Sequence, residues 1–238
     1  MKAKMNKPIY EPRGRAREYG ELALNIYTGC NHGCAYCYAP AALRKDRAAF
    51  AEVQPRTGIV DATRRQLEQE QIKDKTIFLC FTCDPYPANI DTTPTRKIIQ
   101  AIKESGNHVN ILTKGGNRAL WDLDLLDSSD WFGVTLTWVD DKEPNAAPTV
   151  ERYKTLAEAH ALGIKTWASF EPVFNPLMVY KYIECANAID FFKIGKLNHA
   201  PSEINWADFG KEAERLCREY GRNYYIKNDL RAEMEKGR

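Results

Sequence analysis

The sequence lacks the features that mark several large classes of protein. No apolar run approaches the ~18 residues that a membrane span needs, and residues 1–5 lead into polar sequence rather than into the apolar core of a secretory signal. An excess of charge of one sign is also lacking. The 34 Lys and Arg against 32 Asp and Glu give a net charge of +2, which does not mark the whole chain as a nucleic-acid binder. With 44% hydrophobic and 28% charged residues, the 238-residue chain is neither disordered nor fibrous in composition. We expect a soluble, cytoplasmic protein with no membrane partner.

Three of the seven cysteines crowd into eight residues, as Cys30, Cys34 and Cys37. In a cytosolic protein such a group more often binds metal or performs redox chemistry than forms disulfides. Three thiolates do not complete a tetrahedral zinc site, and no fourth cysteine follows at the spacing of a zinc finger. Three thiolates do suit a 4Fe–4S cluster that leaves one iron open to a substrate or cofactor. The alternative is a structural zinc site completed by His32 or by a remote ligand.

Short β-branched or aromatic runs alternate with amphipathic stretches, a pattern typical of repeated βα units. Strands are predicted at residues 24–28, 76–81, 108–113, 132–137, 165–170 and 190–194, with a last short strand at Tyr224–Ile226. Helices are predicted at residues 57–72, 95–105, 117–126, 149–162, 176–186 and 207–220, with Gly106 and Gly163 placed as C-terminal caps. The pattern fits either a partial barrel or an open doubly wound sheet. We expect a basic N-terminal arm at residues 1–20 and a single domain at residues 21–238.

The loops that follow the predicted strands carry polar and reactive residues. In a parallel βα array these loops share the C-terminal edge of the sheet, where such folds place their sites. The residues that we expect to meet there are the three clustered cysteines with Asp84, Lys114, Glu143 and Glu171.

The segment from Tyr27 to Pro40, YTGCNHGCAYCYAP, resembles the cluster loop of radical S-adenosylmethionine enzymes. Within that superfamily it is most similar to the spore photoproduct lyase-like group. Gly14-Arg15-Ala16 upstream, and Asp84-Pro85-Tyr86, Thr113-Lys114 and Glu143-Pro144…Arg152 downstream, follow in the order of that group. Together with the βα order, the resemblance implies an α/β fold, a partial (β/α)6 TIM-type barrel in a single domain.

The resemblance also implies an oxygen-sensitive iron–sulfur enzyme, lyase-like or a radical transferase. Cys30, Cys34 and Cys37 would ligate the 4Fe–4S cluster, and S-adenosylmethionine would chelate the fourth iron. One-electron reduction would then cleave the sulfonium to a 5′-deoxyadenosyl radical that abstracts hydrogen from a substrate. Low-potential electron donors such as flavodoxin or ferredoxin are the partners that this chemistry requires.

Further site residues follow from the same resemblance and from the charges of the cofactor. Tyr36 would approach the adenine, Lys114 the cofactor carboxylate and Asp84 its amino group. The ribose is assigned to Thr135 or Thr137, between which strand alternation does not choose, and Glu171 is placed among the cofactor contacts. For Glu143 and Arg152 there are two interpretations: cofactor contacts, or an ion pair that only fixes the loop.

Candidate redox residues are Tyr36, Tyr38 and Cys83. Tyr38 matches a tyrosine that relays a hydrogen atom in the spore photoproduct lyase-like group. The position of that group's hydrogen-donating cysteine is occupied here by Phe81, with Cys80 and Cys83 on either side. This departure weakens the case for thymine-dimer repair.

The substrate is predicted from the spore photoproduct lyase-like group and from the excess of positive charge in the basic arm. Residues 1–17 of the arm have one acidic residue, Glu11, and the bases Lys2, Lys4, Lys7, Arg13, Arg15 and Arg17. A nucleic-acid base or lesion is the first expectation, although a solvated terminus also explains the arm. A peptide or small metabolite is the second expectation, and a zinc-stabilised nucleic-acid-binding module without catalysis is the non-enzymatic one. Lys196 and His199 are expected at the mouth of the site.

Overall fold

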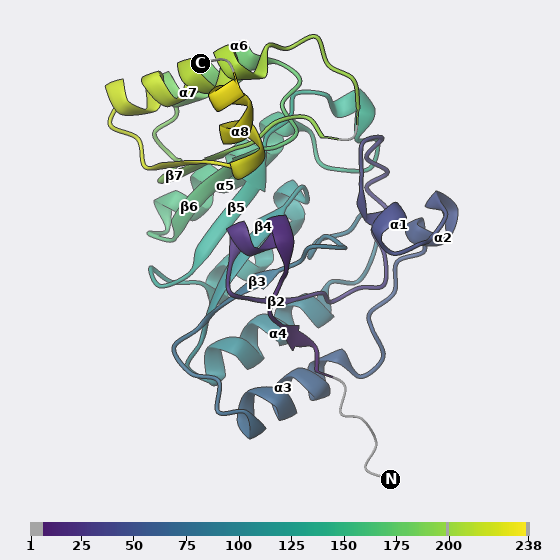
Figure 1. The fold of residues 1–238 in the computed structure, drawn as a ribbon. Helices are drawn as coiled ribbons and strands as arrows, with labels where there is room; N and C mark the ends of the chain where they lie inside the picture. The colour runs from purple at the N-terminus through teal and green to yellow at the C-terminus, as the bar shows by residue number, and fades with distance from the viewer. Residues whose placement is uncertain (1–6, 199, 237–238) are drawn as a thin grey trace.

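The structure is a computed structural model that describes residues 7–198 and 200–236. One open eight-stranded sheet, in the order β1 to β8, forms its centre. Strands β2 to β8 run parallel, and β1 pairs antiparallel with β2 at one edge. The strands are β1 (Ile9–Tyr10), β2 (Leu22–Leu24), β3 (Thr76–Leu79), β4 (His108–Thr113), β5 (Trp131–Thr135), β6 (Lys165–Phe170), β7 (Phe191–Ile194) and β8 (Tyr224–Ile226). This open, curved α/β sheet confirms the predicted fold class (Figure 1).

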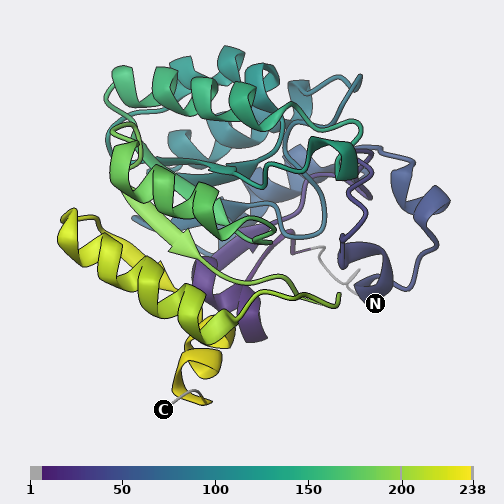
Figure 2. The same cartoon turned by 90° about the horizontal axis from the view of Figure 1, so that it is seen from above.

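The helices are α1 (Ala39–Ala42), α2 (Arg47–Ala51), α3 (Ile59–Gln69), α4 (Thr93–Glu104), α5 (Thr149–Ala161), α6 (Pro176–Cys185), α7 (Trp206–Glu219) and α8 (Asn228–Lys236), with 3-10 runs η1 (Gly14–Tyr19), η2 (Gly116–Leu125) and η3 (Asp140–Lys142). Helices α3 to α7 cover one face of the sheet and build the main core against it, whereas α1 and α2 lie to one side (Figures 1 and 2). Gly106 and Gly163 follow α4 and α5 at φ of 75° and 80°, as their predicted capping role requires. The predicted helix at 117–126 is instead the 3-10 run η2.

The first two predicted strands end earlier than the sequence pattern indicates, and Asn25 is the reason. Its side-chain oxygen accepts hydrogen bonds from the backbone amides of Phe81 and Thr82, both at 2.8 Å. The side chain thereby takes the place of a neighbouring strand, so that β2 ends at Leu24 and β3 at Leu79. The residues beyond are free to form the loops that carry the cysteines.

The second face of the sheet is covered by aromatic side chains and by η1. Tyr19 at the end of η1 packs on Phe78 and Trp167, with ring centroids 5.5 and 6.0 Å apart. The arm is also tied to the C-terminal helix, because Arg15 pairs with Asp229 of α8 at 2.9 Å. Of the predicted arm, Lys2 and Lys4 lie outside the described residues. Among the helices of the described residues, none has the length and apolar character needed to span a membrane.

Candidate active site

A cavity of about 410 Å³ opens at the C-terminal edge of the parallel strands. Loops that follow β2, β3, β4, β6, β7 and β8 contribute to its wall, together with the last residue of β5 and the N-terminal arm. Of the residues predicted from the sequence, those that line the cavity are Cys30, Cys34, Tyr36, Cys37, Tyr38, Cys83, Asp84, Lys114, Thr135, Glu171 and Lys196. The expected convergence on one edge of the sheet therefore takes place for the cysteines, Asp84, Lys114 and Glu171, but not for Glu143, which does not line the cavity.

The cysteine loop, residues 29–37, is held against the segment that carries α2. The Cys30 amide donates to the Phe50 carbonyl at 3.0 Å. Gly29 makes this approach possible, because a Cβ there would lie 2.0 Å from the same carbonyl oxygen. Gly33 turns the loop at φ +72°, and the Cys37 amide donates to the Cys34 carbonyl at 3.1 Å. All three thiols are free and line one cavity.

The donor set of this loop is three thiols, the number that a cluster with one open iron requires. In residues 7–198 and 200–236, no three His, Cys, Asp or Glu side chains lie close enough to hold one ion. His32, the predicted alternative zinc ligand, is buried, and its Nε2 lies 3.0 Å from the Arg118 guanidinium. Burial raises the pKa of the Cys34 thiol to about 11 despite nearby Lys114. An iron–sulfur cluster binds each thiolate at a different iron, so its ligands lie further apart than the ligands of a single ion. Its positive irons would stabilise the thiolate form of these cysteines.

Asp84 joins the loop after β3 to the loop after β4. One carboxylate oxygen accepts from the Thr113 hydroxyl at 2.6 Å and from the Tyr86 amide at 2.8 Å, and the other accepts from the Lys114 amide at 2.9 Å. Burial alone would raise its pKa, but nearby His32 and these hydrogen bonds hold the pKa below its usual value. Asp84 is therefore an ionised carboxylate that fixes Lys114 at the cavity wall.

Lys114 and Tyr36 face one another across the cavity. The ammonium of Lys114 lies 5.7 Å from the centroid of the Tyr36 ring. The Tyr36 hydroxyl donates to Glu143, which fixes the direction of the ring. On its other side the ring packs on Phe174, with centroids 5.6 Å apart.

Glu143 and Arg152 form a fully buried ion pair behind the cavity wall. Arg152 also donates to the carbonyls of Ala147 at 2.7 Å and Thr135 at 3.0 Å. Neither Glu143 nor Arg152 lines the cavity, so their geometry favours the loop-fixing interpretation over a cofactor contact. Burial raises the pKa of Glu143, and the Arg152 guanidinium opposes that rise.

The two threonines at the end of β5 are separated by the structure. Thr135 is the last residue of the strand and lines the cavity. Thr137 lies beyond the strand, where alternation no longer applies, and its hydroxyl donates to Glu143 at 2.9 Å. Of the two predicted ribose contacts, only Thr135 reaches the cavity.

Two further thiols and a tyrosine lie in the same wall. Cys83 accepts a hydrogen bond from the Tyr27 amide at 3.5 Å. Cys80 is buried, and burial together with neighbouring Cys83 raises the pKa of its thiol. The Tyr38 hydroxyl donates to the Phe81 carbonyl at 2.9 Å, so Tyr38 spans from the cysteine loop to the end of β3.

A polar network at the mouth includes residues that sequence reasoning missed. Glu171 forms an ion pair with Lys227 and accepts from the Tyr19 hydroxyl at 2.8 Å and from the Asn198 amide at 3.1 Å. Burial and the nearby Glu171 raise the pKa of Tyr19 well above its usual value. Because Tyr19 and Lys227 come from opposite ends of the chain, no local pattern predicts the contact. The predicted residue His199 lies outside the described residues.

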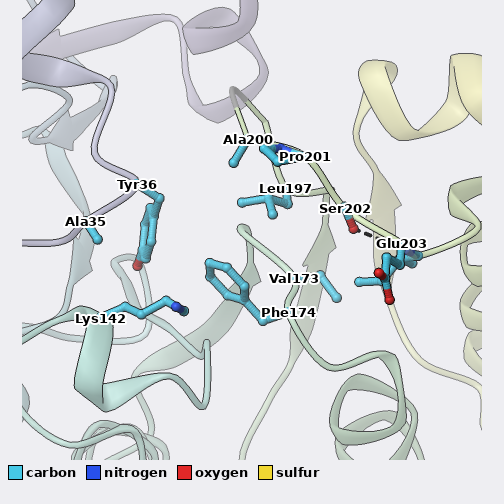
Figure 3. Close-up of a pocket in the computed structure, with 11 residues that line it drawn as sticks. Ala35, Tyr36, Lys142, Val173, Phe174, Leu197, Ala200, Pro201, Ser202 and Glu203 are labelled. Carbon is cyan, nitrogen blue, oxygen red and sulfur yellow. Dashed lines mark hydrogen bonds between the residues drawn. The ribbon is translucent and has the colours of Figure 1, made fainter.

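An open groove of about 670 Å³ adjoins the cavity and shares the Tyr36 ring with it (Figure 3). Phe174 and Val173 after β6 form one wall, and the segment that follows β7 forms the other with Leu197 and Pro201. The groove is therefore a slot beside the cysteine loop with apolar walls and with Lys142, Ser202 and Glu203 among its lining residues.

Comparison with known proteins gives a family and a fold. The sequence profile of the family described as "Protein of unknown function (DUF5131)" matches residues 16–232. "Uncharacterized protein ORF301" of Acidianus two-tailed virus is 27% identical over 175 residues, which are 65% of this chain and 56% of that protein. "Uncharacterized protein MJ0683" of Methanocaldococcus jannaschii is 27% identical over 191 residues, 77% of this chain and 71% of that protein. The chain thus spans little more than half the length of the viral relative.

Solved structures share the fold at low sequence identity. A spore photoproduct lyase mutant superposes with a TM-score of 0.69 at 12% identity, covering 91% of this chain and 78% of that one. Streptococcus suis SuiB bound to S-adenosylmethionine superposes with a TM-score of 0.63 at 14% identity, covering 85% of this chain and 49% of that one. These neighbours confirm, at the level of the fold, the resemblance to radical S-adenosylmethionine enzymes and to spore photoproduct lyase.

Proposed function

The chain belongs to the DUF5131 family, and we propose that it is a radical S-adenosylmethionine enzyme that removes a hydrogen atom from its substrate. One observation carries this proposal: three free loop cysteines line a cavity at the C-terminal edge of a parallel sheet, together with Lys114 and Thr135. The fold shared with SuiB bound to S-adenosylmethionine supports it.

Cys30, Cys34 and Cys37 would hold a 4Fe–4S cluster. When bound, the cluster supplies the electron that cleaves S-adenosylmethionine to a 5′-deoxyadenosyl radical. The chain's own part is to fix the three thiolates on a loop that is tied to Phe50 and to exclude water from one side with apolar Ala39 and Phe50.

The cavity offers a partner for each polar group of S-adenosylmethionine. The Lys114 ammonium would pair with the carboxylate, and the Thr135 hydroxyl would bond the ribose. Tyr36, held by Glu143, would face the adenine from the groove in Figure 3. Asp84, an ionised carboxylate in the cavity wall, would attract the amino group by its charge, while its hydrogen bonds hold Thr113 and the backbone of Lys114 in place.

Hydrogen atoms would move through side chains at the end of β3. Cys83 is the proposed hydrogen donor to a substrate radical, because it lies in the cavity wall beside the buried thiol Cys80. Tyr38 bridges the cysteine loop to Phe81 and is the proposed relay.

A nucleic-acid base or lesion is the proposed substrate. Cations from three parts of the chain line the cavity: Arg13, and Arg15, Lys196 and Lys227, which form ion pairs with Asp229, Glu233 and Glu171. The positive side chains of the arm, Arg13 above all, suit the phosphates that flank a base. A spore photoproduct lyase with a similar fold has been solved in complex with dinucleoside spore photoproduct.

The test is anaerobic loading with iron and sulfide, reduction with dithionite, and measurement of 5′-deoxyadenosine in the presence of S-adenosylmethionine. Fully deuterated DNA and RNA oligonucleotides are then supplied, and deuterium in the 5′-deoxyadenosine is measured by mass spectrometry. We expect product in wild type, none in Cys34→Ala, and deuterium transfer from one nucleic acid. Transfer from a deuterated peptide instead would overturn the substrate, and stoichiometric zinc without iron or product would overturn the enzyme.

A further inference from the structure

We propose that residues 44–47, the basic segment that leads from α1 into the first residue of α2, form the docking surface for an acidic, low-potential electron-carrier protein. This inference rests on the proposed function, because that chemistry needs one electron for each cleavage. Each cleavage would oxidise the cluster by one electron, so the electron for the next cleavage has to come from outside the chain.

The basic segment lies directly on the outer side of the cysteine loop. The Arg47 guanidinium donates to the carbonyls of Cys34 at 3.0 Å and Ala35 at 2.7 Å. Lys45 donates to the Thr28 carbonyl at 3.1 Å. A protein that contacts these side chains is separated from the cluster ligands by a single layer of backbone, and electron transfer is fastest over the shortest path.

The charge of the segment selects an acidic partner. Arg44, Lys45 and Arg47 are exposed and fall within four residues. The one acid among them, Asp46, is used to cap α2 by accepting from the Ala49 amide at 2.8 Å. Such a patch would steer an acidic carrier into a small, salt-sensitive contact of the kind that transient redox complexes use.

The position of the segment favours a carrier over a nucleic acid. The face of α1 and α2 that points into the cavity consists of Ala39 and Phe50, and residues 44–47 do not line the cavity. Substrate phosphates would meet the N-terminal arm at Arg13, which lines the cavity. Figure 1 shows α1 and α2 at one side of the molecule, away from α8. At this surface the carrier loses one electron and the cluster gains it, and no atom is transferred.

The test compares two double charge reversals in the cluster-loaded protein. Arg44→Glu with Lys45→Glu alters the proposed surface and leaves Arg47 in place. Lys154→Glu with Lys181→Glu makes the same change in net charge at exposed positions of α5 and α6. Binding of a bacterial flavodoxin is measured by calorimetry at low and high salt, and 5′-deoxyadenosine is measured with reduced flavodoxin and, separately, with dithionite.

We expect the first variant to weaken flavodoxin binding about tenfold at low salt and to slow flavodoxin-driven cleavage, with the control changed less than about twofold. Dithionite-driven cleavage should be the same in all three proteins. Equal weakening in both variants, no weakening in either, or loss of oligonucleotide binding instead of flavodoxin binding would overturn the docking surface. Absence of dithionite-driven product in wild type would count against the proposed function, whereas the binding data would still decide the surface.

Discussion

The buried ion pair between Glu143 and Arg152 gives the sharpest prediction of stability. Glu143 is only 1% exposed. Arg152→Met removes its cationic partner and leaves the carboxylate with hydrogen bonds from the hydroxyl groups of Thr137 and Tyr36. It also leaves the carbonyls of Thr135 and Ala147 without their guanidinium donor. Breaking one side of a buried pair costs about 3–5 kcal/mol. In a chain of this size we therefore expect the melting temperature to fall by about 6–20 °C.

The matched control is Arg64→Met, which removes the same side chain from an exposed pair with Glu104 at 2.6 Å. Exposed pairs contribute about 0–1 kcal/mol, so this variant should melt within a few degrees of wild type. The double variant Glu143→Leu with Arg152→Met should recover part of the loss, because no buried charge is left unpaired. The free energy of unfolding and the melting temperature of all three variants are measured by urea and thermal unfolding of the protein without added iron.

The loss in Arg152→Met should also depend on pH. Burial raises the pKa of Glu143 in the folded protein, and Arg152→Met removes the cation that opposes that rise. The folded state then binds its proton more tightly than the unfolded chain, so the contribution of Glu143 to stability falls as pH increases above the unfolded value. The deficit relative to wild type should be smaller at pH 5 than at pH 8. A deficit below about 1 kcal/mol at pH 8 would refute the buried-pair reasoning.

Other perturbations test separate parts of the site. Cys34→Ala should lose the cluster and all cofactor cleavage while near-UV circular dichroism stays that of wild type; retained cleavage would remove Cys34 from the ligand set. Lys114→Ala should raise the dissociation constant for S-adenosylmethionine about tenfold to a hundredfold, as for a lost charge-assisted hydrogen bond, with iron content unchanged. Gly29→Ala should reduce iron loading, because its Cβ would lie 2.0 Å from the Phe50 carbonyl oxygen, and full loading would contradict that close contact. Burial lowers the pKa of Lys193 to about 8, so the charged form of this side chain opposes folding below that pH. Between pH 7 and 10, the free energy of unfolding of wild type should therefore rise relative to that of Lys193→Met by up to about 3 kcal/mol, as measured by urea unfolding.

Local patterns predicted the parallel strands and the cysteine loop, but not where strands stop. Period-2 burial in β4 and the capping glycines Gly106 and Gly163 are short-range signals, and the structure follows them. The end of β2 depends instead on Asn25, whose bonds to the amides of Phe81 and Thr82 span more than fifty residues. No window of sequence contains such a contact.

The same distinction holds within the site. The convergence of Asp84 and Lys114 follows from parallel topology alone, so the loop positions sufficed to predict it. The polar network around Glu171 does not follow from the topology, because Tyr19 and Lys227 meet only when both ends of the chain pack across the sheet. The choice between Thr135 and Thr137 likewise needed the point at which β5 ends.

The central claim is that Cys30, Cys34 and Cys37 hold a 4Fe–4S cluster with one iron left open for S-adenosylmethionine. The most direct measurement is the Mössbauer spectrum of protein loaded with ⁵⁷Fe, recorded with and without S-adenosylmethionine. The account predicts a four-iron spectrum in which the signal of one iron alone shifts when S-adenosylmethionine is added. A spectrum that does not change on addition, or a protein that takes up zinc and no iron, would contradict it.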